Sequence, residues 1–318
     1  MATYAPQELA VALKDGLLSF PVTPFTGDGE IDEERYREHI DWQSSFQIGG
    51  LFAAGGTGEG FSLTPEESAR VVRLAVESAA GRTPVLGSAG GNTTQAIQNA
   101  RAAESAGAEG LLLLPPYLTE ADQDGLLEHA SAICGSTSLG VIVYNRGNAV
   151  YSAQTVAQLA ERHPNFIGFK DGKGDIEQLT RVYAANGDRL FYLGGLPTAE
   201  TFALPLLQLG MSTYSSAMYN FVPEFALAFY RDVRSMNHAA VTEKLSRFVL
   251  PYVDIRDRAK GYGVSIVKGG MKAIGRDMGS VRAPLQDLTA QDLADLGALL
   301  DAAGVRPVGD AGAAALAG

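Results

Sequence analysis

The stretch GVIVYNRGNAVYSAQTVAQLAERHPNFIGFKDG, residues 140–172, contains the unit on which the predicted fold depends. An apolar run at 140–144 leads into a longer amphipathic segment, and a second apolar run follows at 166–169. Runs of this kind, rich in Val, Ile, Leu and Phe, are typical of parallel strands that are buried on both faces. The stretch therefore predicts a strand, a crossover helix and a second strand parallel to the first.

The same alternation recurs along the chain and gives eight predicted strands. They lie at 17–22, 50–54, 84–87, 110–114, 140–144, 166–169, 190–193 and 211–215. Their starts are roughly 20 to 35 residues apart, which leaves room for one helix and two short loops each time. Eight successive units favour an α/β fold of the (β/α)8 TIM barrel type over an open doubly wound sheet, because closure pairs every strand edge.

Two helices carry clear start signals in the sequence. Thr64 precedes Pro65 and two glutamates, which is a capping hydroxyl followed by proline at the first helical position and acids in the first turn. Asn92 precedes Gln95 by three residues, which is a second capping pattern. Both signals stand directly after the loops that should follow predicted strands, as the barrel requires.

The strand-like runs stop near residue 233, and the pattern changes to helical period at 239–255, 264–274 and 289–303. We therefore expect the barrel, with a short N-terminal segment, to occupy 1–233 and a C-terminal helical region to occupy 234–304. The last residues read DAGAAALAG and contain no aromatic anchor, so 305–318 is predicted to be a flexible tail.

Composition restricts the classes of function. The chain has 25 basic and 36 acidic residues, a net charge of −11, which argues against nucleic-acid and membrane partners. The one cysteine, Cys134, excludes an internal disulfide and should be a buried thiol. The histidines lie in or beside helix segments, so we expect no metal and no cofactor; they are His39, His129, His163 and His238. No signal peptide or run of about 20 apolar residues is present, which predicts a cytoplasmic location.

The active site of a parallel barrel lies at the C-terminal ends of its strands. Polar or glycine-rich segments follow the apolar runs at Thr23, 55–59, Ser88, Tyr117, 144–146, 170–171, 194–195 and 215–216. Lys170 is one of only seven lysines and ends the run NFIGFK. Burial there should lower its pKa and make a neutral, nucleophilic amine available. The structural alternative is an ammonium at the barrel rim, or one paired with Asp171 or Glu59.

Three further features have both a functional and a structural interpretation. Tyr144 ends the neighbouring strand and could transfer protons beside Lys170, or simply close the barrel as an aromatic plug. The turn GGTGEG, with the Thr57 hydroxyl, could bind a carboxylate through its N–H groups, or be a plain tight turn. Its spacing fits neither a P-loop nor a dinucleotide fingerprint. Lys268 and Lys272 lie one helical turn apart and are expected to form a solvated face.

Four motifs occur in the order of one family: GGTGE after the second predicted strand, PPY after the fourth, VYN after the fifth and GFKDG after the sixth. Over about 16–274 the chain resembles the dihydrodipicolinate synthase and N-acetylneuraminate lyase family of class I aldolases. The resemblance implies that Lys170 forms a Schiff base and that Tyr144 is the acid/base. It further implies that Gly56 and Thr57 bind the carboxylate of a pyruvate-like substrate, and that the protein is a homotetramer, a dimer of dimers.

The chain departs from the synthase pattern at three places. The usual G-T-T-G-E is GGTGE here, which removes one hydroxyl from the carboxylate site. Leu118 stands after Tyr117 where the synthases have a second tyrosine. The arginine that follows Y-N-x-P in the synthases is missing from YNRGNAV. The synthase reaction of lysine biosynthesis is therefore not expected.

The combination of YNRGNA and GFKDGKGD is similar to one branch of the family, whose members are lyases that remove water and carbon dioxide from a six-carbon sugar diacid. This decarboxylating dehydratase activity on a small-molecule substrate is the expected function. Arg146, Asn148 and Ser215 are the candidates to hold the distal carboxylate or the hydroxyls. The alternatives are an aldolase for a 2-keto-3-deoxy sugar acid, a sugar-phosphate isomerase on the same barrel, and a non-catalytic sugar-acid sensor.

Overall fold

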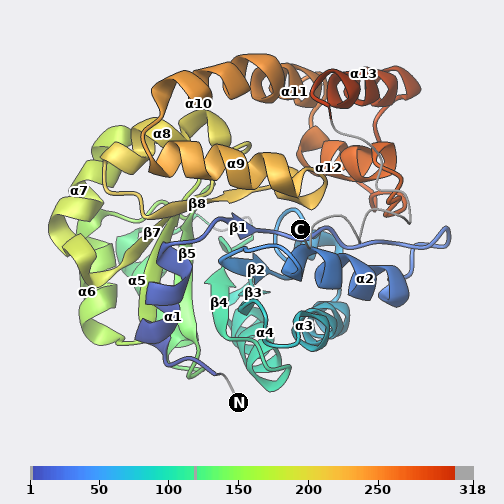
Figure 1. The fold of residues 1–318 in the computed structure, drawn as a ribbon. Coiled ribbons are helices and arrows are strands. Elements are labelled where there is room, and N and C mark those ends of the chain that lie inside the picture. Colours follow the sequence, from blue (N-terminus) through green and yellow to red (C-terminus); the bar gives the residue numbers. More distant parts are fainter. Residues whose placement is uncertain (1–2, 118–119, 305–318) are drawn as a thin grey trace.

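The computed structural model describes residues 3–117 and 120–304, and its strands form a closed parallel barrel (Figure 1). The strands follow one another around the barrel in sequence order, with β1 beside β8. They are β1 Leu18–Ser19, β2 Gly50–Phe52, β3 Val85–Ala89, β4 Gly110–Leu113, β5 Gly140–Asn145, β6 Phe166–Asp171, β7 Phe191–Gly194 and β8 Thr213–Ser216. All eight predicted strands and the (β/α)8 fold are confirmed.

Helices connect the strands on the outside of the barrel, after an N-terminal helix, α1. They are α1 Pro6–Lys14, α2 Glu33–Ser44, α3 Pro65–Ala79, α4 Thr93–Ser105, α5 Gln123–Cys134, α6 Ala153–Arg162, α7 Ile176–Asn186, α8 Glu200–Gln208 and α9 Pro223–Arg234, with short 3-10 helices η1 Gly60–Ser62, η2 Gly187–Arg189 and η3 Met218–Asn220. Both predicted caps are confirmed, because the side chains of Thr64 and Asn92 accept N–H bonds from Glu67 and Gln95.

Two apolar cores stabilise this architecture. The larger core lies between the strands and the surrounding helices and includes the buried thiol Cys134, as predicted. The smaller core fills the barrel interior, where strand residues such as Leu112 and Ile142 meet Leu9 and Leu13 of α1. Helix α1 thus closes the N-terminal end of the barrel. The polar chemistry is left to the opposite end, where the strands terminate.

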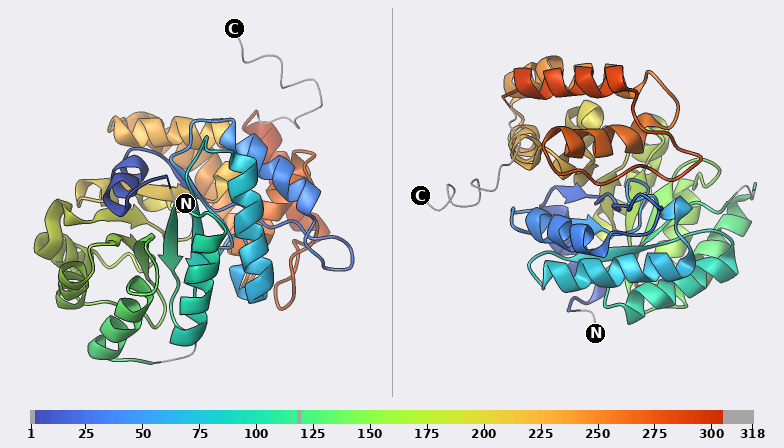
Figure 2. Two further views of the ribbon diagram at one scale, coloured as in Figure 1. Left: turned by 90° about the horizontal axis from the view of Figure 1, so that it is seen from below. Right: turned by 90° about the vertical axis from the view of Figure 1, so that its right-hand side faces the viewer.

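The C-terminal helices form a further layer on one side of the barrel (Figure 2). They are α10 His238–Lys244, the π-helical segment η4 Leu245–Val249, α11 Leu250–Arg256, α12 Tyr262–Ala273 and α13 Ala290–Ala302. The helices predicted at 239–255, 264–274 and 289–303 are therefore confirmed, with a π-helical segment inside the first. Helix α12 packs against α13 and against η3, which follows β8. The predicted tail at 305–318 lies outside the described residues.

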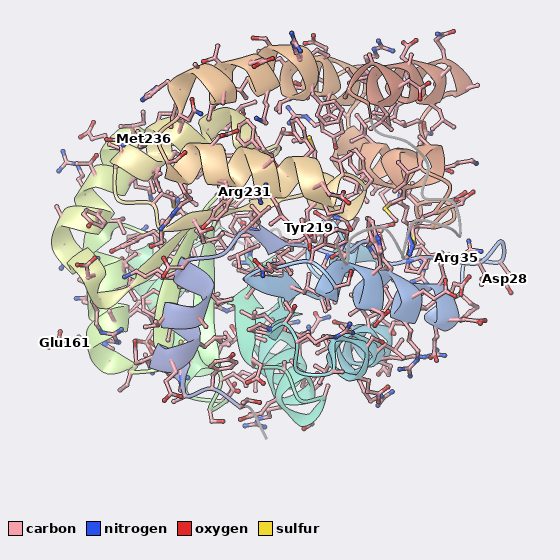
Figure 3. All side chains as sticks on the ribbon, viewed as in Figure 1. Asp28, Arg35, Glu161, Tyr219, Arg231 and Met236 are labelled. Atoms are coloured by element: carbon pink, nitrogen blue, oxygen red, sulfur yellow. The ribbon has the colours of Figure 1, made fainter. Side chains whose placement is uncertain are left out.

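Side chains divide between the interior and the periphery of the molecule. Figure 3 shows Tyr219 beneath α9 inside the molecule, whereas Asp28, Arg35 and Glu161 lie at its edge. Within residues 3–117 and 120–304, no helix is both long enough and apolar enough to cross a membrane.

Candidate active site

Lys170 and Tyr144 lie side by side at the C-terminal ends of β6 and β5. They are register partners, and Lys170 is in turn the partner of Leu193, a residue of the barrel-interior core. The lysine Nζ lies 4.2 Å from the centroid of the Tyr144 ring and 3.7 Å from that of Phe20. Both side chains are buried. The structure therefore brings the two predicted catalytic residues together in the mouth of the barrel.

The surroundings of Lys170 favour its neutral amine. Burial lowers the pKa of Lys170 well below its ordinary value, and the positive charge of Arg146 lowers it further. Among the described residues, no ion pair includes Lys170. The proposed pairing with Asp171 is wrong, because that carboxylate accepts bonds from the Asn145 amide and the Gly174 N–H. A neutral amine in an apolar setting is a nucleophile at neutral pH.

Two glycines make room for the lysine and for the ring beside it. A Cβ at Gly195 would lie 2.2 Å from Cε of Lys170, and a Cβ at Gly55 would lie 2.5 Å from Cδ1 of Phe20. Real Cβ atoms do not approach other carbons this closely, so any side chain here would displace the lysine or the ring. The glycine after β7 is thus required by the position of Lys170, and the glycine after β2 by the position of Phe20.

The hydroxyl of Tyr144 makes two hydrogen bonds. It donates to the carbonyl of Gly195 at 2.8 Å and accepts from Nη1 of Arg146 at 2.8 Å. Burial raises the pKa of Tyr144, and the charge and hydrogen bond of Arg146 counteract part of that rise. A guanidinium stabilises a phenolate, so this arrangement suits a phenol that loses and regains a proton. The sequence did not predict this contact of Arg146.

The glycine-rich turn, residues 55–60, follows β2 and is stabilised by two hydrogen bonds. The Thr23 hydroxyl donates to the carbonyl of Gly58 at 2.7 Å, and Gly60 N–H donates to Gly55 at 2.9 Å. Within the described part of the chain, no group accepts a hydrogen bond from the N–H of Gly56 or Thr57. These two N–H groups and the half-buried Thr57 side chain can therefore donate to an anion.

The remaining predicted site residues are Asn148 and Tyr117 in loops at the mouth of the barrel and Ser215 in β8. Asn148 donates to the carbonyl of Pro116 at 3.0 Å, which joins the loop after β5 to the loop after β4. Ser215 is the register partner of Leu18, an interior residue, so its side chain faces into the barrel. Tyr117 is 77% exposed, and the neighbouring Leu118 lies outside the described residues.

The prediction that Lys268 and Lys272 form a solvated face is wrong for Lys268. Its side chain is 3% exposed and its Nζ lies 2.7 Å from Oε1 of Glu59, whereas Lys272 is 57% exposed. The physical reason is that α12 directs Lys268 toward the glycine-rich turn. All residues from 264 to 271 are buried, as the apolar and small residues around Lys268, VSIVKGGM, indicate. That signal could have identified the buried lysine, whereas no local pattern marks Phe20 or the Gly195 carbonyl.

A model of the dihydrodipicolinate synthetase family matches residues 13–303. The chain belongs to this family. The match covers both the barrel and the helices after residue 233.

Two curated relatives of high identity carry the same name. A protein of Pseudarthrobacter chlorophenolicus, named probable 5-dehydro-4-deoxyglucarate dehydratase, is 71% identical over 300 residues, which cover 94% of this chain and 99% of the relative. A Corynebacterium glutamicum protein of the same name is 67% identical over 304 residues, 96% of each chain.

Solved structures of the family match at lower identity. Dihydrodipicolinate synthase from Bacillus clausii has a TM-score of 0.86 and 26% identity, with 93% of this chain and 99% of the synthase covered. The synthase from Acinetobacter baumannii, solved in complex with pyruvate, has a TM-score of 0.81 and 26% identity, with 92% and 99% covered.

Proposed function

We propose that the chain converts 5-dehydro-4-deoxy-D-glucarate to 2,5-dioxopentanoate, carbon dioxide and water through a Schiff base on Lys170. The observation that carries this proposal is the buried Lys170 amine, which lies beside the Tyr144 phenol and forms no ion pair with any of the described residues. Relatives that are 58% to 71% identical bear the name of this dehydratase, which is a decarboxylating hydro-lyase.

The glycine-rich turn is proposed to bind the carboxylate next to the substrate ketone. Gly56 and Thr57 offer N–H donors and a hydroxyl, and Gly55 packs against the Phe20 ring that lies beside the Lys170 amine. The Acinetobacter baumannii synthase was solved with pyruvate, which has the same 2-oxo acid group as the reacting end of this substrate. Carboxylate binding would therefore place the ketone carbon near the amine.

The distal end of the diacid is proposed to meet Arg146, Asn148 and Ser215. Arg146 is exposed and uses Nη1 for Tyr144, so the rest of its guanidinium faces solvent, where a second carboxylate can approach. Asn148 lies two residues further along the same loop, and Ser215 faces the barrel interior. One arginine would thus connect the distal carboxylate with the acid/base.

The first half of the reaction is a dehydration. The Lys170 amine attacks the C5 ketone, and the carbinolamine loses water with a proton from Tyr144. The resulting iminium acidifies C4, whose proton passes to the Tyr144 phenolate. The electron pair left at C4 expels the C3 hydroxyl, which takes up a proton and leaves as water. The product is an iminium conjugated with a C3–C4 double bond.

The second half uses the same electron sink. The C1–C2 bond breaks, carbon dioxide leaves, and the electron pair moves through the conjugated system to the Lys170 nitrogen. Protonation at C4 and hydrolysis of the iminium then free the lysine. The enol left at C2 becomes the aldehyde. The water consumed in hydrolysis balances the one released in iminium formation, so the net losses are one water and one carbon dioxide.

Product analysis tests this proposal. Purified enzyme incubated with 5-dehydro-4-deoxyglucarate should release carbon dioxide and 2,5-dioxopentanoate in equal amounts. The rival aldolase of the same family would release pyruvate and no carbon dioxide, and that result would contradict the proposal. A homotetrameric assembly, a cytoplasmic location and independence of any cofactor or metal stay predictions beside it.

A further inference from the structure

An ion pair buried outside the reaction centre connects the C-terminal layer to the glycine-rich turn. Nζ of Lys268, on α12, lies 2.7 Å from Oε1 of Glu59, and the two side chains are 3% and 0% exposed. Glu59 is two residues from Thr57, which belongs to the proposed carboxylate site. The pair therefore connects α12 to the glycine-rich turn, which is proposed to bind the substrate carboxylate.

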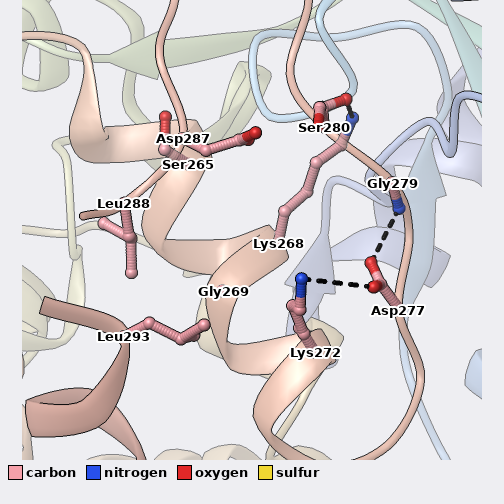
Figure 4. Close-up of a pocket in the computed structure, with 10 residues that line it drawn as sticks. All are labelled: Ser265, Lys268, Gly269, Lys272, Asp277, Gly279, Ser280, Asp287, Leu288 and Leu293. Carbon is pink, nitrogen blue, oxygen red and sulfur yellow. Dashed lines mark hydrogen bonds and ion pairs between the residues drawn. The ribbon is translucent and has the colours of Figure 1, made fainter. Parts of the chain in front are cut away.

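Both partners are held by additional contacts. The other carboxylate oxygen of Glu59, Oε2, accepts a hydrogen bond from the backbone N–H of Arg282 at 2.9 Å. Lys268 donates to the carbonyl of Ser280 at 2.9 Å (Figure 4). Its Nζ also lies 4.3 Å from the centroid of the Phe25 ring. Buried charges are costly unless they are paired and hydrogen-bonded, and these contacts meet that condition. The geometry of the pair is thus fixed from several sides.

The backbone of the turn explains what the pair can do. Glu59 has φ of +56°, a left-handed conformation that is costly for a residue with a side chain. In that conformation its N–H donates to the carbonyl of Gly56 at 3.2 Å, and this carbonyl belongs to the peptide group whose N–H is that of Thr57. A contact that holds Glu59 in place therefore also orients the Thr57 N–H.

We propose that Lys268 and Glu59 are positioning residues that keep the glycine-rich turn in the shape that binds the substrate carboxylate. The C-terminal helical layer then takes part in substrate recognition without touching the substrate. The proposal rests on the function proposed above for Gly56 and Thr57. A merely structural pair would stabilise the fold but would not discriminate between ligands with and without a carboxylate.

Lys272 provides a matched control for a test of Lys268. It lies one turn further along α12, is 57% exposed, and faces Asp277 with its Nζ 3.6 Å from the carboxylate (Figure 4). Both lysines line a cavity of about 130 Å³ beside α12 and α13, so the two substitutions change the same region. Lys268→Met and Lys272→Met remove the same charge from the same helix, and only the first removes the contact with Glu59.

The measurement is borohydride trapping of Lys170 as a function of ligand concentration, with two probes. Pyruvate has a carboxylate beside its ketone, and hydroxyacetone is a ketone of similar size without one. Lys268→Met should raise the half-saturating pyruvate concentration about tenfold or more. This is the effect of losing one hydrogen bond to a charged group, here the bond from the Thr57 N–H to the pyruvate carboxylate. Hydroxyacetone trapping should not change, and Lys272→Met should leave both probes unchanged.

Glu59→Gln is the second variant, because it keeps an acceptor for the Arg282 N–H while removing the charge that pairs with Lys268. It should weaken pyruvate trapping selectively even where Lys268→Met does not fold. Equal losses with both probes, or unchanged pyruvate trapping in a folded variant, would overturn the proposal. If wild-type enzyme forms no adduct on Lys170 with pyruvate or with 5-dehydro-4-deoxyglucarate, the proposed function itself fails, so the two failures are distinguishable.

Discussion

Arg146 affects both residues of the proposed reaction centre. Its charge lowers the pKa of Lys170, in the same direction as burial, and it donates a hydrogen bond to the Tyr144 hydroxyl. For Tyr144 the arginine opposes the effect of burial on the pKa. One side chain thus favours the neutral amine and the phenolate together, which are the protonation states that nucleophilic attack and proton abstraction require.

Replacing Arg146 should therefore change the pH profile of the enzyme. The amine must be neutral to react, so kcat/KM rises as pH increases through the pKa of Lys170. Arg146→Met removes the charge that lowers this pKa and should move the acidic limb to higher pH, whereas Arg146→Lys keeps a charge and should move it less. If Arg146→Met raises KM but leaves the acidic limb of the pH profile where it is in the wild type, Arg146 only binds the distal carboxylate.

At the scale of elements, α8 and β8 meet at a buried carboxyl that the proposed reaction does not use. The Ser216 hydroxyl donates to the Glu200 carboxyl, and burial raises the pKa of Glu200 to about 7 from an ordinary 4.5. The pKa of Glu200 is higher in the folded protein than in the unfolded chain. The stability that its protonated carboxyl contributes is therefore fully present below pH 4.5. It is lost as pH rises through 7.

Glu200→Gln should remove this pH dependence. Wild-type protein should lose about 3 kcal/mol of unfolding free energy between pH 4.5 and 8 through this one group, and the variant should not lose it. Urea unfolding of both proteins at the two pH values measures the difference. Parallel pH dependence in the two proteins would show that Glu200 ionises normally in the fold.

Strand positions could be predicted from the sequence, but strand ends could not. The apolar run at 84–87 identified β3, which extends to Ala89 because Ser88 and Ala89 pair through their backbones with Leu112 and Leu113 of β4. Backbone pairing does not depend on side-chain polarity, so the apolar run ended before this strand did. The π-helical segment at Leu245–Val249 was likewise not visible in a periodicity that only separates helix from strand.

At the scale of the whole molecule, the predictable part of the site is the part that barrel closure determines. Closure places all strand ends around one mouth, so a lysine and a tyrosine near the ends of neighbouring strands had to meet. The partners of Glu59 depend instead on how α12 packs against the barrel. Helical lysines are mostly exposed, so the sequence favoured a solvated Lys268, and only tertiary packing overrides that preference.

The central claim is that Lys170 carries the substrate as a Schiff base. Its most direct test is borohydride reduction in the presence of 5-dehydro-4-deoxyglucarate, followed by mass spectrometry of the peptide that contains GFKDG. The adduct should lie on Lys170, disappear in Lys170→Ala and persist in Lys173→Ala, which changes the exposed lysine three residues later. No adduct, or an adduct on Lys173 or another lysine, would contradict the claim.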